Sequence, residues 1–188
     1  NISSFISKIL LMPITLILLG VFLLLMFRKT ILKMLGIEPT IKGDAPNGFK
    51  KVAKKYGVDF ARDLERMFRK ETRHFESKQW LNCGTPGMEA KSLTFPFGWD
   101  SLGRWAKANG VDEKDFFIKY FKDNHTGKNT PFVGFKNTGH TVLFIAWFIQ
   151  NIRGGDIYSW YRLPINDKAI AQRKKYAFEM AQINTHFV

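Results

Sequence analysis

The chain has 188 residues, of which 29 are Lys or Arg and 16 are Asp or Glu, and its formal net charge is +13. This charge predicts a polyanionic partner, such as nucleic acid, acidic lipid headgroups or an anionic cell-wall polymer, without selecting among them. The single cysteine, Cys83, excludes an intramolecular disulfide framework, and the four histidines and Cys83 lack the spacing of a zinc site, so we expect no metal and no cofactor.

The first element along the chain is an uncharged apolar run at residues 9–27. At about 1.5 Å per residue, a helix of this length crosses a hydrocarbon core about 30 Å thick. A cleaved signal peptide is the alternative, but its apolar region is usually shorter and ends at a small-residue cleavage site. Here the run ends at Phe27 and is followed by Arg28 and Lys29. We therefore predict a retained transmembrane anchor with its flanks at residues 1–36, which makes the chain a single-pass membrane protein. The basic residues after the span favour the cytoplasmic side, or its topological equivalent, for the rest of the chain.

Residues 37–48 contain Pro and Gly without an apolar period, which predicts a linker, and residues 49–188 suit one globular domain. Within that domain the periodicity predicts helices at 49–56, 59–74, 101–109, 112–124, 138–152, 157–162 and 167–184. The segment 138–152 is apolar on all sides and is expected to be the central buried helix. A strand-like stretch at 92–97 is expected to form one arm of a small hairpin. The predicted class is mainly α with at most a small β-hairpin.

Glu71 lies on what should be the buried face of the helix expected at 59–74. At about 100° per residue it falls near the centre of an apolar stripe. That stripe consists of Phe60, Leu64, Met67, Phe68 and Phe75. The opposite side carries the charged residues Arg62, Glu65, Arg66, Arg69 and Arg73. A carboxylate directed at a core is costly unless it is paired, hydrogen-bonded or protonated, and a raised proton affinity is what a general acid needs near neutral pH.

A structural salt bridge, or a helix end that already faces solvent, would also account for a glutamate at this position. The following segment favours a functional interpretation. Residues 77–88 form a turn-rich stretch with two glycines and a proline. An acid at the end of a helix, followed by a glycine-lined loop, predicts the wall of a cleft.

The same residues carry a family resemblance. Glu71-Thr72, a variable stretch, and then Gly84-Thr85-Pro86-Gly87-Met88 resemble the core of the lysozyme-like superfamily, in particular the lytic transglycosylases and the peptidoglycan-degrading lysozymes of bacteriophages. The family pattern is a helix ending in Glu-Ser, about a dozen residues, and then Gly-Ala-x-Gly-Leu-Met-Gln. The resemblance implies that residues 49–188 form a lysozyme-like helical catalytic domain in which Glu71 is the acid that protonates the glycosidic oxygen.

The other site residues follow from that resemblance. It implies substrate-binding positions at Thr72, Gly84, Thr85, Gly87 and Met88. Glu89 and Ala90 replace the Met-Gln that completes the family motif. Tyr158 and Tyr161 are candidates for the aromatic residue that flanks the cleft. Trp99 belongs to the aromatic group at 95–99, which is the best placed for stacking on a sugar. Ordinary core packing would explain each of these residues.

Glycoside cleavage needs an acid and normally a second group. If no second carboxylate lies across the cleft, Glu71 serves as acid and then as base for the 6-hydroxyl of the sugar, which gives a 1,6-anhydro product. If one does, Glu89 and Asp100 are the candidates, and hydrolysis becomes possible.

The resulting hypothesis is a membrane-anchored enzyme that cuts peptidoglycan glycan strands. It would reside in a bacterial envelope or, as a phage virion protein for wall penetration, in the internal membrane of the virion. Its partners would be peptidoglycan and, through residues 9–27, a lipid membrane, with no specific nucleic acid. The alternative is a non-enzymatic, basic, membrane-tethered module that binds peptidoglycan or nucleic acid. That alternative predicts an arginine paired with Glu71.

Overall fold

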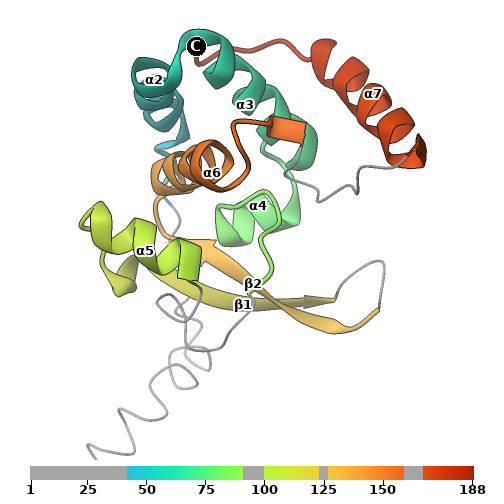
Figure 1. Ribbon diagram of the computed structural model, residues 1–188. Helices are drawn as coiled ribbons and strands as arrows, with labels where there is room; N and C mark the ends of the chain where they lie inside the picture. Colours follow the sequence, from blue (N-terminus) through green and yellow to red (C-terminus); the bar gives the residue numbers. More distant parts are fainter. Residues whose placement is uncertain (1–41, 91–99, 123–126, 159–166) are drawn as a thin grey trace, which may run out of the picture. The chain divides into compact units, whose positions relative to one another are not determined.

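The chain divides into two compact units, Asn1–Pro39 and Thr40–Val188. The computed structural model describes residues 42–90, 100–122, 127–158 and 167–188, which all belong to the second unit (Figure 1). Among these described residues, no helix has the length and apolar character needed to cross a membrane. The predicted anchor at 9–27, the strand expected at 92–97, and the site candidates Trp99 and Tyr161 lie outside the described residues.

The second unit is mainly helical with a two-stranded antiparallel sheet, as the sequence predicts. Its elements in chain order are α2 (Ala45–Tyr56), α3 (Val58–Glu71), α4 (Lys78–Cys83), α5 (Asp100–Ala108), the 3₁₀ turn η1 (Glu113–Asp115), β1 (Phe116–Lys122), β2 (Asn129–Phe135), α6 (Thr138–Ile152) and α7 (Asp167–Ala181).

Helix α6 occupies the middle of this unit, between α2 and α5, and it has the bounds that its apolar run predicts (Figure 1). It begins at Thr138 because the side chain of Asn137 accepts a hydrogen bond from the backbone N–H of Gly139 at 2.8 Å. Phe144, which is 1% exposed, packs edge-on against Trp105 of α5, with ring centroids 5.4 Å apart. The apolar character of α6 on all sides is therefore explained by neighbours on several sides.

Helices α2 and α6 approach each other closely at Gly48. A Cβ atom at this position would lie 2.9 Å from the Cβ of Val142 and 3.1 Å from the backbone of Gly139. We expect Gly48→Ala to lower the free energy of unfolding by roughly 1–2 kcal/mol, because overpacking exceeds the gain in helix propensity. Chemical denaturation followed by tryptophan fluorescence measures this difference. Gly43→Ala is the matched control, since nothing lies within 4 Å of its Cβ position; equal stability losses in the two variants would contradict the packing argument.

The helix expected at 112–124 is wrong, because residues 113–122 of this segment form the turn η1 and the first strand of a hairpin. Asp112 does act as a cap, accepting from the backbone N–H of Lys114 at 2.9 Å, but the turn that it starts ends at Asp115. The next seven residues are mostly aromatic or β-branched, and they pair with β2 in a register that sets Phe116 opposite Phe135. The rings of these two residues are 4.8 Å apart in the core. The capping residue Asp112 therefore suggested a helix where the chain forms strand β1.

Other elements also differ from the sequence expectation. Helix α2 begins inside the predicted linker, where Pro46 suits a first helical turn. The linker is also attached to the fold just before this helix, because the N–H of Lys42 donates to the carbonyl of Lys136 at 2.8 Å. Helix α4 lies in the stretch expected to be turns, and Ser77 caps it by accepting from the N–H of Trp80 at 3.1 Å. Helix α3 ends at Glu71 instead of His74.

Candidate functional site

The side chain of Thr72 explains why α3 ends at Glu71. Its hydroxyl donates to the carbonyl of Phe68 at 2.6 Å and accepts from the backbone N–H of Phe75 at 2.8 Å, while the side chain itself is fully buried. Residues 73–75 then take positive φ angles of 51°, 58° and 70°. Non-glycine residues adopt this left-handed conformation at a cost of about 1–2 kcal/mol each. The tight turn leaves the Glu71 side chain at the end of the helix.

Glu71 is half-buried, and within the described part of the chain it accepts a hydrogen bond from a residue distant in the sequence. The hydroxyl of Tyr176, in α7, donates to its Oε1 at 2.7 Å. Burial raises the pKa of Glu71 above its ordinary value, and this effect outweighs the hydrogen bond from Tyr176 and the charge of Lys70, both of which lower it. The carboxyl group thus combines a raised proton affinity with a fixed orientation.

Tyr176 is a site residue that the sequence does not reveal. It is separated from Glu71 by 105 residues, and no local pattern distinguishes it from the rest of α7. Its pKa is raised by burial first and by the neighbouring Glu71 carboxylate second, so the phenol stays protonated and acts as a donor. The ammonium group of Lys70 lies 5.0 Å from the centroid of the Tyr176 ring, within the range of a cation–π contact.

Tyr158 joins the same cluster. Its ring meets that of Tyr176 edge-on, with centroids 6.3 Å apart and planes at 90°. Its backbone N–H donates to Oδ1 of Asp156 at 3.0 Å, and Asp156 forms an ion pair with Arg173 of α7. The structure therefore brings one of the two tyrosine candidates to the Glu71 region, through Tyr176.

The candidates in the glycine loop are mostly buried and bonded to the fold. The hydroxyl of Thr141 donates to the carbonyl of Gly84 at 2.7 Å, and that of Thr85 donates to the carbonyl of Val133 at 3.2 Å. The carbonyl of Met88 accepts from the N–H of Val133 at 2.7 Å. Gly87 has φ of 105°, which favours glycine at that point of the turn. These contacts attach the loop to α6 and β2, and a direct contact with substrate stays a prediction.

The two candidates for a second carboxylate lie at the surface. Glu89 is exposed and forms an isolated bridge with Phe132, next to β2. Asp100 is exposed and pairs with Arg104 at 3.1 Å, one turn along α5. Among the contacts of the described residues, neither carboxylate meets Glu71 or Tyr176.

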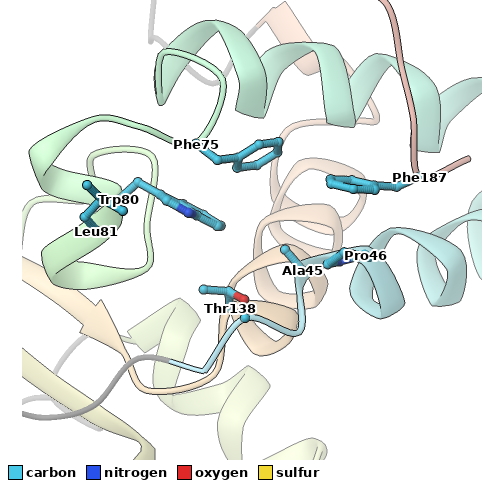
Figure 2. Close-up of a pocket in the computed structure, with 8 residues that line it drawn as sticks. Ala45, Pro46, Phe75, Trp80, Leu81, Thr138 and Phe187 are labelled. Atoms are coloured by element: carbon cyan, nitrogen blue, oxygen red, sulfur yellow. The ribbon is translucent and has the colours of Figure 1, made fainter.

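An open groove of about 340 Å³ lies on another part of the surface (Figure 2). Its lining residues are Gly43, Ala45, Pro46, Phe75, Trp80, Leu81, Thr138 and Phe187. Figure 2 shows Phe75, Trp80 and Phe187 around it, and Glu71 is not part of the lining. The groove is therefore separate from the Glu71 cluster.

The face of α3 that the sequence assigns to solvent is partly buried, which corrects the helical-wheel expectation. Glu65 is fully buried and Arg69 is 8% exposed. Oε1 of Glu65 accepts from Nε of Arg69 at 2.8 Å and from the N–H of His186 at 2.8 Å, and Oε2 accepts from the N–H of Phe187 at 3.0 Å. Residues 183–188 cover this face, and such a long-range contact leaves no trace in the local periodicity of α3.

The chain was compared with known protein families, curated proteins and solved structures. No protein-family model, curated protein or solved structure matches the chain. The site is therefore interpreted from its own geometry and from the motif at 71–88.

Replacing Tyr176 by Phe tests the geometry of this site. Loss of the hydroxyl removes a hydrogen bond that favours the ionised carboxylate, so we expect the pKa of Glu71 to rise further. Titration of the Glu71 carboxyl group by NMR measures that shift directly. Tyr56→Phe is the control, because Tyr56 packs against Phe60 on a different part of the fold. An unchanged or lowered pKa of Glu71 in Tyr176→Phe would contradict the arrangement described.

Proposed function

We propose that the chain is a membrane-anchored enzyme that cleaves the glycan strands of peptidoglycan, with Glu71 as the acid and base. The observation that carries the proposal is a half-buried carboxyl group of raised pKa at the end of α3, held by a neutral phenol. The family pattern that the sequence resembles also has its glutamate at the end of a helix. The predicted anchor at 9–27 would keep the domain beside the wall, either in a bacterial envelope or in the internal membrane of a virion.

The geometry suits a single-carboxylate route. Tyr176 occupies Oε1, and Oε2 has no hydrogen-bond partner among the described residues. The protonated Oε2 would donate to the glycosidic oxygen as the C–O bond breaks, and the carboxylate left behind would be stabilised by the Tyr176 hydroxyl. The same carboxylate would then accept the proton of the 6-hydroxyl as that oxygen bonds to C1. The products are a 1,6-anhydro sugar and a shortened strand, and Glu71 is protonated again.

The exposed positions of Glu89 and Asp100 favour this route over hydrolysis. A hydrolase would need a second carboxylate across the cleft to activate water or to stabilise the cation. We expect Glu89→Gln and Asp100→Asn each to retain activity within about threefold of the wild type, a range typical of a surface substitution. A loss of two orders of magnitude in either variant would favour hydrolysis with that residue as the second group.

A binding module remains the second candidate, and the net charge of +13 favours it. Glu89 and Ala90 stand where the family motif has Met-Gln, which suits a fold that has kept binding and lost cleavage. The version of this candidate that is a basic tethered module without the enzyme's ancestry predicts an arginine paired with Glu71. The Glu71 carboxylate is instead bonded to Tyr176, and the buried Arg69 of α3 pairs with Glu65.

The test incubates the full chain, purified in mild detergent, with purified peptidoglycan and measures soluble sugar fragments and sedimented protein in parallel. Release of fragments supports the enzyme. Co-sedimentation of a folded chain without any release would overturn the proposed activity in favour of the binding module.

A further inference from the structure

Helix α7 has two faces of different character. The inner face carries Tyr176, which bonds Glu71 of α3, Arg173, which pairs with Asp156, and Met180, which is 1% exposed. At about 100° per residue, positions two apart lie on roughly opposite sides of a helix. Phe178 therefore points away from both Tyr176 and Met180, and it is 68% exposed. Figure 1 shows α7 beside α3, and no other labelled helix or strand lies against its outer side.

The outer face combines apolar and basic residues in one stripe. Ile170, Lys174 and Phe178 recur every fourth residue, and Ile170 is 42% exposed. Lys174 is exposed between the two apolar side chains, and the side chain of Lys175 beside it is 79% exposed. The aliphatic stem of a lysine can extend the apolar surface while its charge stays in water. An isolated exposed apolar residue needs no explanation, but an aromatic, an isoleucine and two lysines on one face form an amphipathic surface.

We propose that this outer face of α7 lies on an anionic lipid bilayer. Phe178 and Ile170 would enter the boundary between headgroups and acyl chains, and Lys174 and Lys175 would contact anionic headgroups. The combination of apolar side chains and lysines on one face selects this occupant, because lipid phosphates suit the lysines and the acyl boundary suits Phe178 and Ile170. Glu179 pairs through Oε2 with Lys70 of α3, and its Oε1 lies 3.9 Å from Nζ of Lys175. The two lysines together outweigh this single carboxylate, and the side chain of Lys175 stays 79% exposed. This surface does not depend on the proposed chemistry, but it shares a helix with the phenol that holds Glu71.

A local probe tests the proposal in the full chain. In a Cys83→Ala background, an environment-sensitive fluorophore is attached at Phe178→Cys, and at Gln172→Cys or Arg62→Cys as exposed controls elsewhere. The chain is reconstituted with phosphatidylcholine vesicles, with or without phosphatidylglycerol, that contain lipids brominated on their acyl chains. We expect a blue shift and quenching at position 178 on anionic vesicles, and neither at 172 nor at 62. The signal is local, so it does not depend on whether residues 9–27 cross the bilayer.

The second part of the experiment tests whether docking of α7 requires its two lysines. Near an anionic surface each lysine contributes about fivefold, so Lys174→Gln with Lys175→Gln should reduce the ratio of docked to undocked α7 roughly thirtyfold. Absence of quenching at 178, or equal quenching at 178 and 172, would overturn the proposal. Quenching at 178 that is unchanged by the two lysine substitutions and by omission of phosphatidylglycerol would overturn the proposal as well. A blue shift that grows with protein concentration in the absence of vesicles would assign the face to a second copy of the chain instead.

Discussion

Replacing Glu71 by Gln is expected to reduce peptidoglycan cleavage by about 10²–10⁴-fold, the usual contribution of a general acid. Glutamine keeps the size of the side chain and an acceptor for the Tyr176 hydroxyl, but it cannot supply a proton to the glycosidic oxygen. Initial rates of fragment release, measured at equal concentrations of folded protein, give the ratio. Glu76→Gln is the matched control, since it makes the same chemical change at an exposed position five residues away. Equal rates in wild type and Glu71→Gln would remove Glu71 from the chemistry.

The same substitution should affect stability in a pH-dependent way. Because burial raises the pKa of Glu71 in the folded state, ionisation costs more in the folded protein than in the unfolded chain. The stabilising contribution of the neutral acid is therefore complete below the unfolded pKa and is lost as the pH rises through the folded pKa. We expect Glu71→Gln to become more stable relative to wild type over that rise. A difference that is constant with pH, in unfolding curves at several pH values, would contradict a raised pKa.

The largest expected effect on stability is at Arg69. Arg69→Met leaves the fully buried Glu65 carboxylate without its cationic partner, and breaking a buried ion pair from one side typically costs about 3–5 kcal/mol. Chemical denaturation followed by the fluorescence of the buried Trp80 and Trp105 measures this loss. Arg62→Met, on an exposed position of the same helix, should change stability by less than about 0.5 kcal/mol.

A double-mutant cycle separates the charge from the packing. Combining Arg69→Met with Glu65→Gln removes the unpaired charge while keeping an oxygen for one of the two backbone N–H groups at residues 186 and 187. The double variant should be more stable than Arg69→Met alone. If it is equally unstable, the loss arises from the Arg69 contacts with the rings of Phe75 and Phe187 and not from the ion pair.

The elements that could be predicted from the sequence are those whose pattern is set by local signals. The bounds of α6 follow from an apolar run with the Asn137 cap, and Glu71 could be singled out because a charge interrupts an apolar stripe. The hairpin was missed because Asp112 offers a genuine cap, and only pairing with β2 shows that the residues after η1 are extended. Helix periodicity does not report such a partner strand.

The parts of the site that could not be predicted depend on distant segments. Tyr176 reaches Glu71 from α7, and residues 186 and 187 bury Glu65 on a face that the α3 pattern marks as polar. In both cases a side chain or backbone group more than a hundred residues away decides whether a glutamate is solvated. The sequence could thus identify the unusual carboxylate at 71, but it could not identify the groups that tune it.

The most direct test of the central claim is the mass of the glycan ends that the full chain produces from purified peptidoglycan. If Glu71 is the single acid and base, wild-type protein releases muropeptides with 1,6-anhydro ends, and these disappear in Glu71→Gln and persist in Glu76→Gln. Fragments with reducing ends would contradict the single-carboxylate route. Anhydro fragments formed equally by Glu71→Gln would contradict the assignment of Glu71 itself.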